Sequence, residues 1–213
     1  MSIDDVLSVY HRPLSPYGAG AKRLEDITIS LLALLLLAPL FTAIAILVKV
    51  DSRGPVIFRQ ERVGFGNRRF FVFKFRTMRH KATSDPQVPQ AKRNDPRVTR
   101  VGAVLRRFSL DELPQLFNVL RGDMSLVGPR PHAAAHNEKY ALLIDGYLTR
   151  HRMKPGLTGW AQVHGERGRT ETVQHMQRRL EYDLYYIANW SLYLDLKVML
   201  MTIPAIIRGT NAY

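Results

Sequence analysis

Apolar positions form one long block near the start of the chain. Residues 27–48, with the sequence ITISLLALLLLAPLFTAIAILV, make a run of 22 positions without a charged side chain. As a straight helix this run is about 33 Å long, enough to cross the apolar layer of a bilayer. It lies too far from the first residue, and lacks a small-residue cleavage site, to be a secretory signal peptide. We predict a membrane segment over residues 22–50, preceded by a flexible, proline- and glycine-containing lead-in over residues 1–21.

A proline near the middle of this segment, Pro39, interrupts the apolar run. Proline removes a backbone donor and clashes with the carbonyl four residues earlier, so the helix should kink or break at membrane depth. Two geometries remain open: a kinked span, and a re-entrant helix-break-helix that enters and leaves by one face. Lysine and arginine flank the run at residues 22, 23, 49 and 53. Since basic flanks favour the cytoplasmic side, we favour the re-entrant geometry.

Alternating patterns follow the membrane segment. Residues 56–64 and 68–78 are strand-like runs separated by a glycine-containing turn, which predicts a β-hairpin. In the second run, aromatic residues at 71, 73 and 75 alternate with Val72, Lys74 and Arg76. By itself this pattern is typical of a half-buried strand whose basic face is solvated.

The rest of the chain reads mainly as helices. Residues 80–100 form a polar loop punctuated by prolines, which we interpret as a lid or a mobile connection. Helix patterns cover residues 108–120, 132–151, 171–187 and 192–207, and residues 154–160 read as a turn. The last helix carries Asp195 and Lys197 early and Pro204 late, as expected for an interfacial amphipathic helix rather than a second span. Trp190, Tyr185, Tyr186 and Tyr193 beside it suit either an aromatic belt at headgroup level or an aromatic core.

Composition limits the chemistry that the chain can perform. With 213 residues and no cysteine, it has no disulfide, no thiolate zinc site and no cysteine nucleophile. Its histidines do not show the spacing of zinc ligands. Lys plus Arg number 31 against 18 acids, a net charge of +13, which predicts a polyanionic partner. Nucleic acid, an anionic lipid surface and a phosphate-rich substrate all satisfy that prediction.

Two adjacent carboxylates, Asp111 and Glu112, lie inside the apolar run FSLDELPQLFNVL. Ser109 followed by Glu112 matches a capping box, whereas Asp111 as the cap would place Pro114 in the first turn. In either frame Asp111 lies in the first helical turn, where the helix dipole favours an ionised carboxylate. An anionic aspartate is also what nucleophilic attack on phosphorus requires. The local sequence leaves capping and catalysis as alternatives.

A short loop after this run, GDMSLVGPRP, places Arg130 between two prolines. The prolines restrict the backbone, and the planar guanidinium suits bidentate binding of phosphate. Gly128 permits a close approach of backbone donors. A carboxylate pair, a basic strand and a membrane segment in one short chain are together difficult to explain by structural needs alone.

Four segments carry a resemblance to a known family: KFRTM (74–78), SLDELPQLFNVLRGDMSLVGPRP (109–131), KPGLTGWAQV (154–163) and RRLEYDLYYIANWSLYLDLKVM (178–199). They resemble the bacterial sugar transferases, the monotopic polyprenyl-phosphate hexose-1-phosphate transferases. The resemblance runs from about Lys22 to the C-terminus. It implies an α/β, mainly helical fold, with interfacial helices around an active site on the cytoplasmic face of the bacterial inner membrane, and a catalytic domain over residues 51–213.

The activity that the resemblance implies is transfer of a hexose 1-phosphate from a UDP-sugar to undecaprenyl phosphate, with release of UMP. This would initiate exopolysaccharide or glycan assembly. Asp111 would be the nucleophile that forms a phosphosugar-aspartyl intermediate, and Glu112 would assist through Mg²⁺, so both carboxylates are candidate metal ligands. A direct transfer without the intermediate stays open. The candidate ligands of the pyrophosphate and the lipid phosphate are Lys74, Arg76, Arg107 and Arg130.

The chain also departs from the family pattern. Members often have serine before the membrane proline, where this chain has Ala38, so a hydroxyl that could satisfy a freed carbonyl is missing. Residues 159–192 resemble the glucose-specific branch, whose members usually carry a larger multi-span N-terminal region. We therefore expect glucose as the sugar, and either a minimal enzyme or a catalytic fragment.

The expected partners are the UDP-sugar, undecaprenyl phosphate and membrane lipid, and no nucleic acid. Downstream glycosyltransferases and a homodimer are left open. The rival function is a non-enzymatic, membrane-anchored basic module that binds nucleic acid or anionic lipid. Such a module has no use for Asp111 and Glu112 inside a cationic site, because they would repel its ligand.

Overall fold

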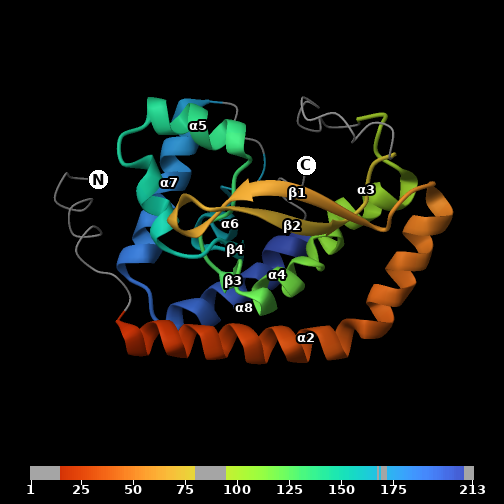
Figure 1. The fold of residues 1–213 in the computed structure, drawn as a ribbon, viewed down its shortest axis with the longest axis horizontal. Helices are drawn as coiled ribbons and strands as arrows, with labels where there is room; N and C mark the ends of the chain where they lie inside the picture. Colours follow the sequence, from red (N-terminus) through yellow and green to blue (C-terminus); the bar gives the residue numbers. More distant parts are fainter. Residues whose placement is uncertain (1–14, 80–94, 167, 169–171, 209–213) are drawn as a thin grey trace.

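A computed structural model describes residues 15–79, 95–166, 168 and 172–208 (Figure 1). The predicted loop over residues 80–100 lies mostly outside these residues, and so do the first 14 residues of the lead-in. Within them, helices surround two small sheets. The helices are α2 (Pro16–Asp51), α3 (Arg100–Arg107), α4 (Gln115–Arg121), α5 (Ala134–Leu143), α6 (Trp160–Val163), α7 (Val173–Ala188) and α8 (Leu192–Arg208). The strands are β1 (Ile57–Val63), β2 (Arg69–Phe75), β3 (Ser125–Val127) and β4 (Gly156–Thr158).

Helix α2 contains the whole predicted membrane segment and begins at Pro16, where the Ser15 hydroxyl accepts a hydrogen bond from the Gly18 amide at 3.1 Å. The helix continues through Pro39. Figure 1 shows it as a long first leg and a shorter second leg with a sharp turn between them. An internal proline is the usual cause of such a kink. The expected break is therefore a kink in one helix, and the re-entrant placement remains a prediction.

Most apolar side chains of α2 are not covered by the rest of the described chain. In its most apolar 18-residue window, with mean hydropathy 2.8, only 11% is buried. Leu24, Leu35, Leu36 and Val50 each expose more than half of their surface. An uncovered apolar surface of this extent is unfavourable in water. Together with a length and composition sufficient to cross a membrane, it supports membrane association of this helix.

The predicted hairpin is confirmed: β1 and β2 pair antiparallel, with Phe58 opposite Lys74 and Arg62 opposite Phe70. The interpretation of its faces was wrong, however. Val72 is buried in the main core, and the Lys74 side chain contacts Glu112 rather than solvent. On the other face, the guanidiniums of Arg59 and Arg121 each lie over the Phe73 ring, 5.6 Å from its centre.

The second sheet, the parallel pair β3 and β4, was not predicted, because residues 154–160 were read as a turn. Its two strands approach so closely that a side chain at Gly156 would overlap backbone: a Cβ there would lie 2.1 Å from the amide nitrogen of Gly128. Glycine at 156 therefore permits a pairing that hydrophobic periodicity does not indicate.

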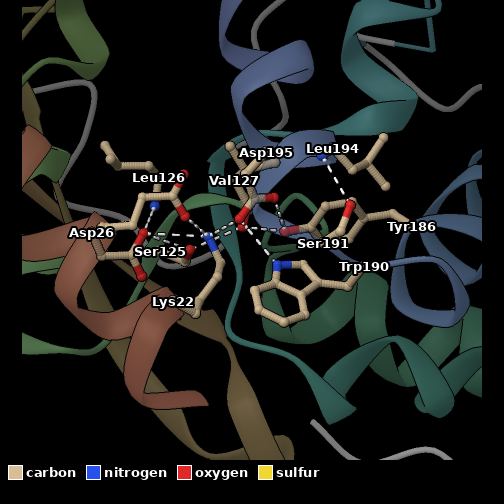
Figure 2. Close-up of polar contacts among 11 residues, drawn as sticks. Lys22, Asp26, Ser125, Leu126, Val127, Tyr186, Trp190, Ser191, Leu194 and Asp195 are labelled. Atoms are coloured by element: carbon tan, nitrogen blue, oxygen red, sulfur yellow. Dashed lines mark hydrogen bonds and ion pairs between the residues drawn. The ribbon is translucent and has the colours of Figure 1, made fainter. Parts of the chain in front are cut away.

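A buried polar network joins the first leg of α2 to β3, α7 and α8 (Figure 2). Asp195 accepts hydrogen bonds from Tyr186 at 2.7 Å and Trp190 at 3.0 Å, and its carboxylate lies 2.7 Å from the Lys22 ammonium. Asp26 accepts from the amide of Leu126 at 2.9 Å. These bonds satisfy charges that would otherwise be costly to bury.

The network also fixes the orientation of α8. Helix α8 buries Leu194 and Val198 and exposes Leu192, Leu196 and Leu200, with Lys197 also exposed. A largely apolar free face with a basic side chain is expected of an interfacial helix. Tyr186 is buried and Tyr193 exposed, so the proposed aromatic belt does not include Tyr186.

Candidate active site

The Asp111–Glu112 pair lies on a short 3₁₀ turn, Leu110–Glu112, between α3 and α4. The capping box was wrong: Ser109 has a left-handed backbone with φ of 57°, and its side chain does not cap the turn. Leu110 and Leu113, on either side of the pair, pack against a buried cluster that contains Ile44 and Val48 of α2. The two carboxylates are thereby held beside the second leg of α2.

Glu112 is paired with two cations. Its Oε1 atom lies 2.7 Å from the Lys74 ammonium and 2.5 Å from Nη2 of Arg130, and its Oε2 accepts from Nη1 of Arg130 at 3.1 Å. Burial alone would raise the pKa of Glu112, but the charges of Arg130 and Lys74 outweigh it and hold that pKa well below its usual value. The sequence thus identified three residues that the fold brings into contact: Lys74, Glu112 and Arg130.

Asp111 differs from its neighbour although both are buried. No donor among the described residues forms a hydrogen bond with its carboxylate. Burial raises the pKa of Asp111 to about 6, with a further increase from the charge of Glu112 and an opposing effect from Lys74. Its oxygens are therefore available to a ligand, and near neutral pH the carboxylate is mostly ionised.

Two of the predicted phosphate ligands lie elsewhere. Arg76 is buried, and its guanidinium donates to Val48 and Ser52 carbonyls at 3.2 and 2.6 Å, and to the Pro55 carbonyl. It satisfies carbonyls at the C-terminal end of α2, which have no partners inside the helix. The Arg107 side chain is exposed, with its guanidinium 5.5 Å from the centre of the Phe108 ring. The fold does not bring either one into the Glu112 cluster.

Sequence reasoning missed the neighbouring Arg106, whose positive charge lowers the pKa of Asp111. Its Nε donates to the Thr77 hydroxyl at 2.8 Å. Nothing in the local sequence distinguishes Arg106 from Arg107; their directions follow from how α3 packs beside Thr77, where Gly102 leaves room. A Cβ at Gly102 would lie 2.2 Å from the Thr77 carbonyl oxygen.

Asn118 sets the distance between the carboxylate turn and the basic strand. Its side-chain amide donates to the Phe71 carbonyl at 2.7 Å and accepts from the Phe73 amide at 3.0 Å. This fully buried side chain thus joins α4 to the backbone of β2 next to Lys74. A lone polar residue within the run LFNVL was the available signal, and the sequence reasoning did not use it.

The backbone at Arg130 rests on a buried ion pair between η4 (Tyr147–Arg152) and α7. Arg150 donates to the Arg130 carbonyl at 2.7 Å and to the Asp183 carboxylate at 2.7 Å. Burial and the charge of Arg150 hold the pKa of His132 well below its usual value, so its ring is neutral. Through Arg150, Asp183 of α7 thus supports the loop that carries Arg130.

The described residues contain no group of three or more side chains suited to a metal ion. Mg²⁺ is commonly held by only one or two carboxylates together with substrate phosphates. Asp111 fits that pattern because its oxygens are available. Glu112 fits it only if a substrate phosphate replaces Glu112 as the ion-pair partner of Lys74 and Arg130.

Residues 17–209 match the family model described as bacterial sugar transferase. A UDP-glucose:undecaprenyl-phosphate glucose-1-phosphate transferase of Escherichia coli (strain K12) is 53% identical over 198 residues, 93% of this chain and 42% of that protein. One of the same name from Caulobacter vibrioides is 52% identical over 192 residues, 90% of this chain and 72% of that protein. A UDP-N-acetylgalactosamine-undecaprenyl-phosphate N-acetylgalactosaminephosphotransferase of Aeromonas hydrophila is 45% identical over 199 residues, 93% of this chain and 46% of that protein. The chain thus spans about two fifths of the length of the Escherichia coli relative.

Proposed function

Since the chain belongs to the bacterial sugar transferase family, we propose that it transfers glucose 1-phosphate from UDP-glucose to undecaprenyl phosphate and releases UMP. The names of two relatives at 52–53% identity support glucose, whereas the relative at 45% identity is named for N-acetylgalactosamine. The observation that carries the proposal is the division between two adjacent carboxylates: Glu112 is ion-paired to Lys74 and Arg130, and Asp111 is left available. A module that only binds polyanions needs no such pair.

In the proposed first step, a carboxylate oxygen of Asp111 attacks the β-phosphorus of UDP-glucose. The bond between that phosphorus and the oxygen bridging to the α-phosphate breaks, and its electron pair leaves with UMP. Glucose 1-phosphate is then joined to Asp111 as an acyl phosphate. Because phosphoryl transfer depends mainly on positioning and charge neutralisation, the cations Lys74 and Arg130 serve this step by binding phosphate oxygens.

In the second step, a phosphate oxygen of undecaprenyl phosphate attacks the same phosphorus. The bond to Asp111 breaks, the carboxylate is regenerated, and undecaprenyl diphosphate glucose is the product. One carboxylate thus serves as nucleophile and then as leaving group, which splits the transfer into two displacements at one site.

We propose that Mg²⁺ assists at the same place. Asp111 would coordinate the ion together with substrate phosphate. Glu112 would become a further ligand once the substrate phosphates bind Lys74 and Arg130 in its place. The ion would supply positive charge that neutralises phosphate oxygens. Arg106 would contribute further positive charge close to Asp111.

The kink in α2 provides a reason for the position of the site. In a re-entrant placement both ends of α2 lie on the cytoplasmic face, and the carboxylate turn packs on its second leg. Asp111 would then lie near the headgroup plane, where the lipid phosphate arrives from the membrane and the nucleotide sugar from water. We propose the cytoplasmic face of the inner membrane as the location.

The experiment that tests the proposal measures UMP release by detergent-purified protein given UDP-glucose and Mg²⁺, with and without undecaprenyl phosphate. Multiple-turnover release that requires the lipid, and that Asp111→Asn abolishes, supports it. No release with UDP-glucose, but release with UDP-N-acetylgalactosamine, would replace the sugar. Silence with every UDP-sugar, from protein shown to be folded, would contradict the function.

A further inference from the structure

Strand pairing in the hairpin places Arg62 on the same face as Lys74. Phe58 lies opposite Lys74 and Arg62 lies opposite Phe70, and side chains two apart in a strand share a face. Positions 58, 60 and 62 of β1 therefore lie on the face that carries Lys74. Arg62 is four residues beyond the partner of Lys74, roughly 13 Å along the strand.

Arg62 forms no direct ion pair with an acidic side chain among the described residues, and the nearest acidic influence on it is the charge of Glu112, which Lys74 and Arg130 contact. Nη2 of Arg62 donates to the neutral Gln60 side chain at 2.5 Å, whereas Lys74 and Arg130 share Glu112, and Arg150 has Asp183. Arg62 is only partly exposed. Burial and the positive charge of nearby Arg130 lower its pKa to about 10, so it stays charged at neutral pH. Arg62 and Arg130 thus share the nearby charge of one carboxylate, Glu112, and a further anion between the two guanidiniums would stabilise both.

The direction of the hairpin indicates which anion. Strand β1 begins at Ile57, shortly after the end of α2, and runs away from the second leg of that helix (Figure 1). Lys74 is paired with the beginning of β1, and Arg62 lies toward its end. Arg130 contacts Glu112 beside Lys74, and its positive charge also lowers the pKa of Arg62. The cations thus extend from the end of the site beside the second leg of α2 toward the end away from that leg. In the re-entrant placement proposed above, the lipid phosphate would arrive beside the second leg of α2, which leaves the far end for the water-soluble nucleotide.

We propose that Arg62 is a further phosphate-binding residue, which with Arg130 binds the nucleotide phosphate that leaves as UMP. This rests on the function proposed above. When the bond to the β-phosphorus breaks, its electron pair remains on the α-phosphate, which gains negative charge. A fixed guanidinium at that phosphate favours the charged leaving group and hence the transition state.

The test compares Arg62→Gln and Arg62→Lys with the matched control Arg59→Gln. Arg59 belongs to the same strand but lies on the opposite face, with its guanidinium over the Phe73 ring. The measurements are inhibition by UMP, direct calorimetric binding of UMP, and steady-state kinetics for both substrates. We expect Arg62→Gln to weaken UMP binding about tenfold, the loss of one charge-assisted contact. The kcat/KM for UDP-glucose should fall by at least as much, the KM for undecaprenyl phosphate should stay constant, and Arg62→Lys should retain part of the activity.

Two results would overturn the inference. One is UMP binding by Arg62→Gln equal to that of Arg59→Gln. The other is a raised KM for undecaprenyl phosphate with UMP binding intact, which would assign Arg62 to the lipid phosphate. Thermal unfolding of both variants controls for the fold. Calorimetry with UMP also separates the two proposals, because an unmodified protein that binds UMP but never turns over UDP-glucose contradicts the proposed function alone.

Discussion

Arg130 forms a two-pronged ion pair with Glu112, with Nη2 2.5 Å from Oε1 and Nη1 3.1 Å from Oε2. The fork geometry of guanidinium and carboxylate makes this the stronger kind of ion pair. Glu112 is therefore occupied and strongly acidic, while the adjacent Asp111 keeps free oxygens and a pKa of about 6. The roles of nucleophile and supporting carboxylate follow from this difference in partners.

Replacing Asp111 should make the protein more stable and inactive. Because folding raises the pKa of Asp111 from 3.8 to about 6, the folded state disfavours its ionised form, and the cost is fully present above pH 6. A shift of this size corresponds to about 3 kcal/mol. Asp111→Asn should therefore unfold at a higher temperature at pH 7.5, and the gain should vanish near pH 4. Equal or lower stability at pH 7.5 would show that Asp111 is not strained by burial.

The rate should depend on pH through the same group. Attack requires the ionised carboxylate, so kcat/KM for UDP-glucose should rise with pH through about 6 and be lost below it. Glu112→Gln removes the negative charge that raises the pKa of Asp111, so the acidic limb of the pH profile should move to lower pH. The maximal rate should fall by roughly 10²-fold, because Lys74 and Arg130 lose the carboxylate that orients them. A limb that stays in place in Glu112→Gln would contradict the coupling between the two carboxylates.

Arg76 and Arg130 should behave differently when each is replaced by glutamine. Arg76 donates to carbonyls at the end of α2, so its loss should lower stability by about 1–3 kcal/mol and leave the KM for UDP-glucose unchanged. Arg130→Gln should raise that KM with a smaller effect on stability. Unfolding curves and substrate titrations of the two variants, measured in parallel, decide the matter. A raised KM in Arg76→Gln, with stability intact, would return Arg76 to the site.

The buried Arg150–Asp183 pair should act on activity through Arg130. Asp183→Leu alone leaves the buried Arg150 charge uncompensated and should cost about 3–5 kcal/mol. Adding Arg150→Met should recover much of that stability, because an apolar pair can replace a buried ion pair. Activity should not recover, since the bond to the Arg130 carbonyl is still missing. Recovery of kcat/KM together with stability would reduce the pair to a purely structural role.

The sequence predicted the elements that have a clear period. The apolar run, the hairpin and helices α7 and α8 each show their hydrophobic period over enough residues to be recognised. Strand alternation, however, assigned the face of Lys74 to solvent, whereas that side chain pairs with Glu112. Strands β3 and β4 were missed because three residues carry no period, and only the close contact at Gly156 explains their pairing.

The resemblance predicted the site residues that touch one another: Asp111, Glu112 and Arg130 lie within one resembling segment, and Lys74 lies within another. It did not predict Arg106 or the support that Asp183 gives, because both act through packing between distant parts of the chain. Arg76 is two residues after Lys74 and so shares its strand face, but the C-terminal end of α2 packs against Arg76. Nothing in the strand sequence indicates this contact. Leu110 and Leu113, by packing on α2, place the carboxylates on a separate turn instead of a capped helix.

The covalent role of Asp111 is the central claim, and a single-turnover experiment tests it most directly. Purified protein is mixed with UDP-glucose and Mg²⁺ without undecaprenyl phosphate, quenched with acid, and examined by intact-protein and peptide mass spectrometry beside Asp111→Asn. We predict one equivalent of UMP per enzyme and a mass increase of one hexose phosphate, located on the peptide that contains Asp111 and removed by adding the lipid. Lipid-dependent turnover with no UMP burst and no modified peptide would contradict the account, and would leave direct transfer between the two substrates.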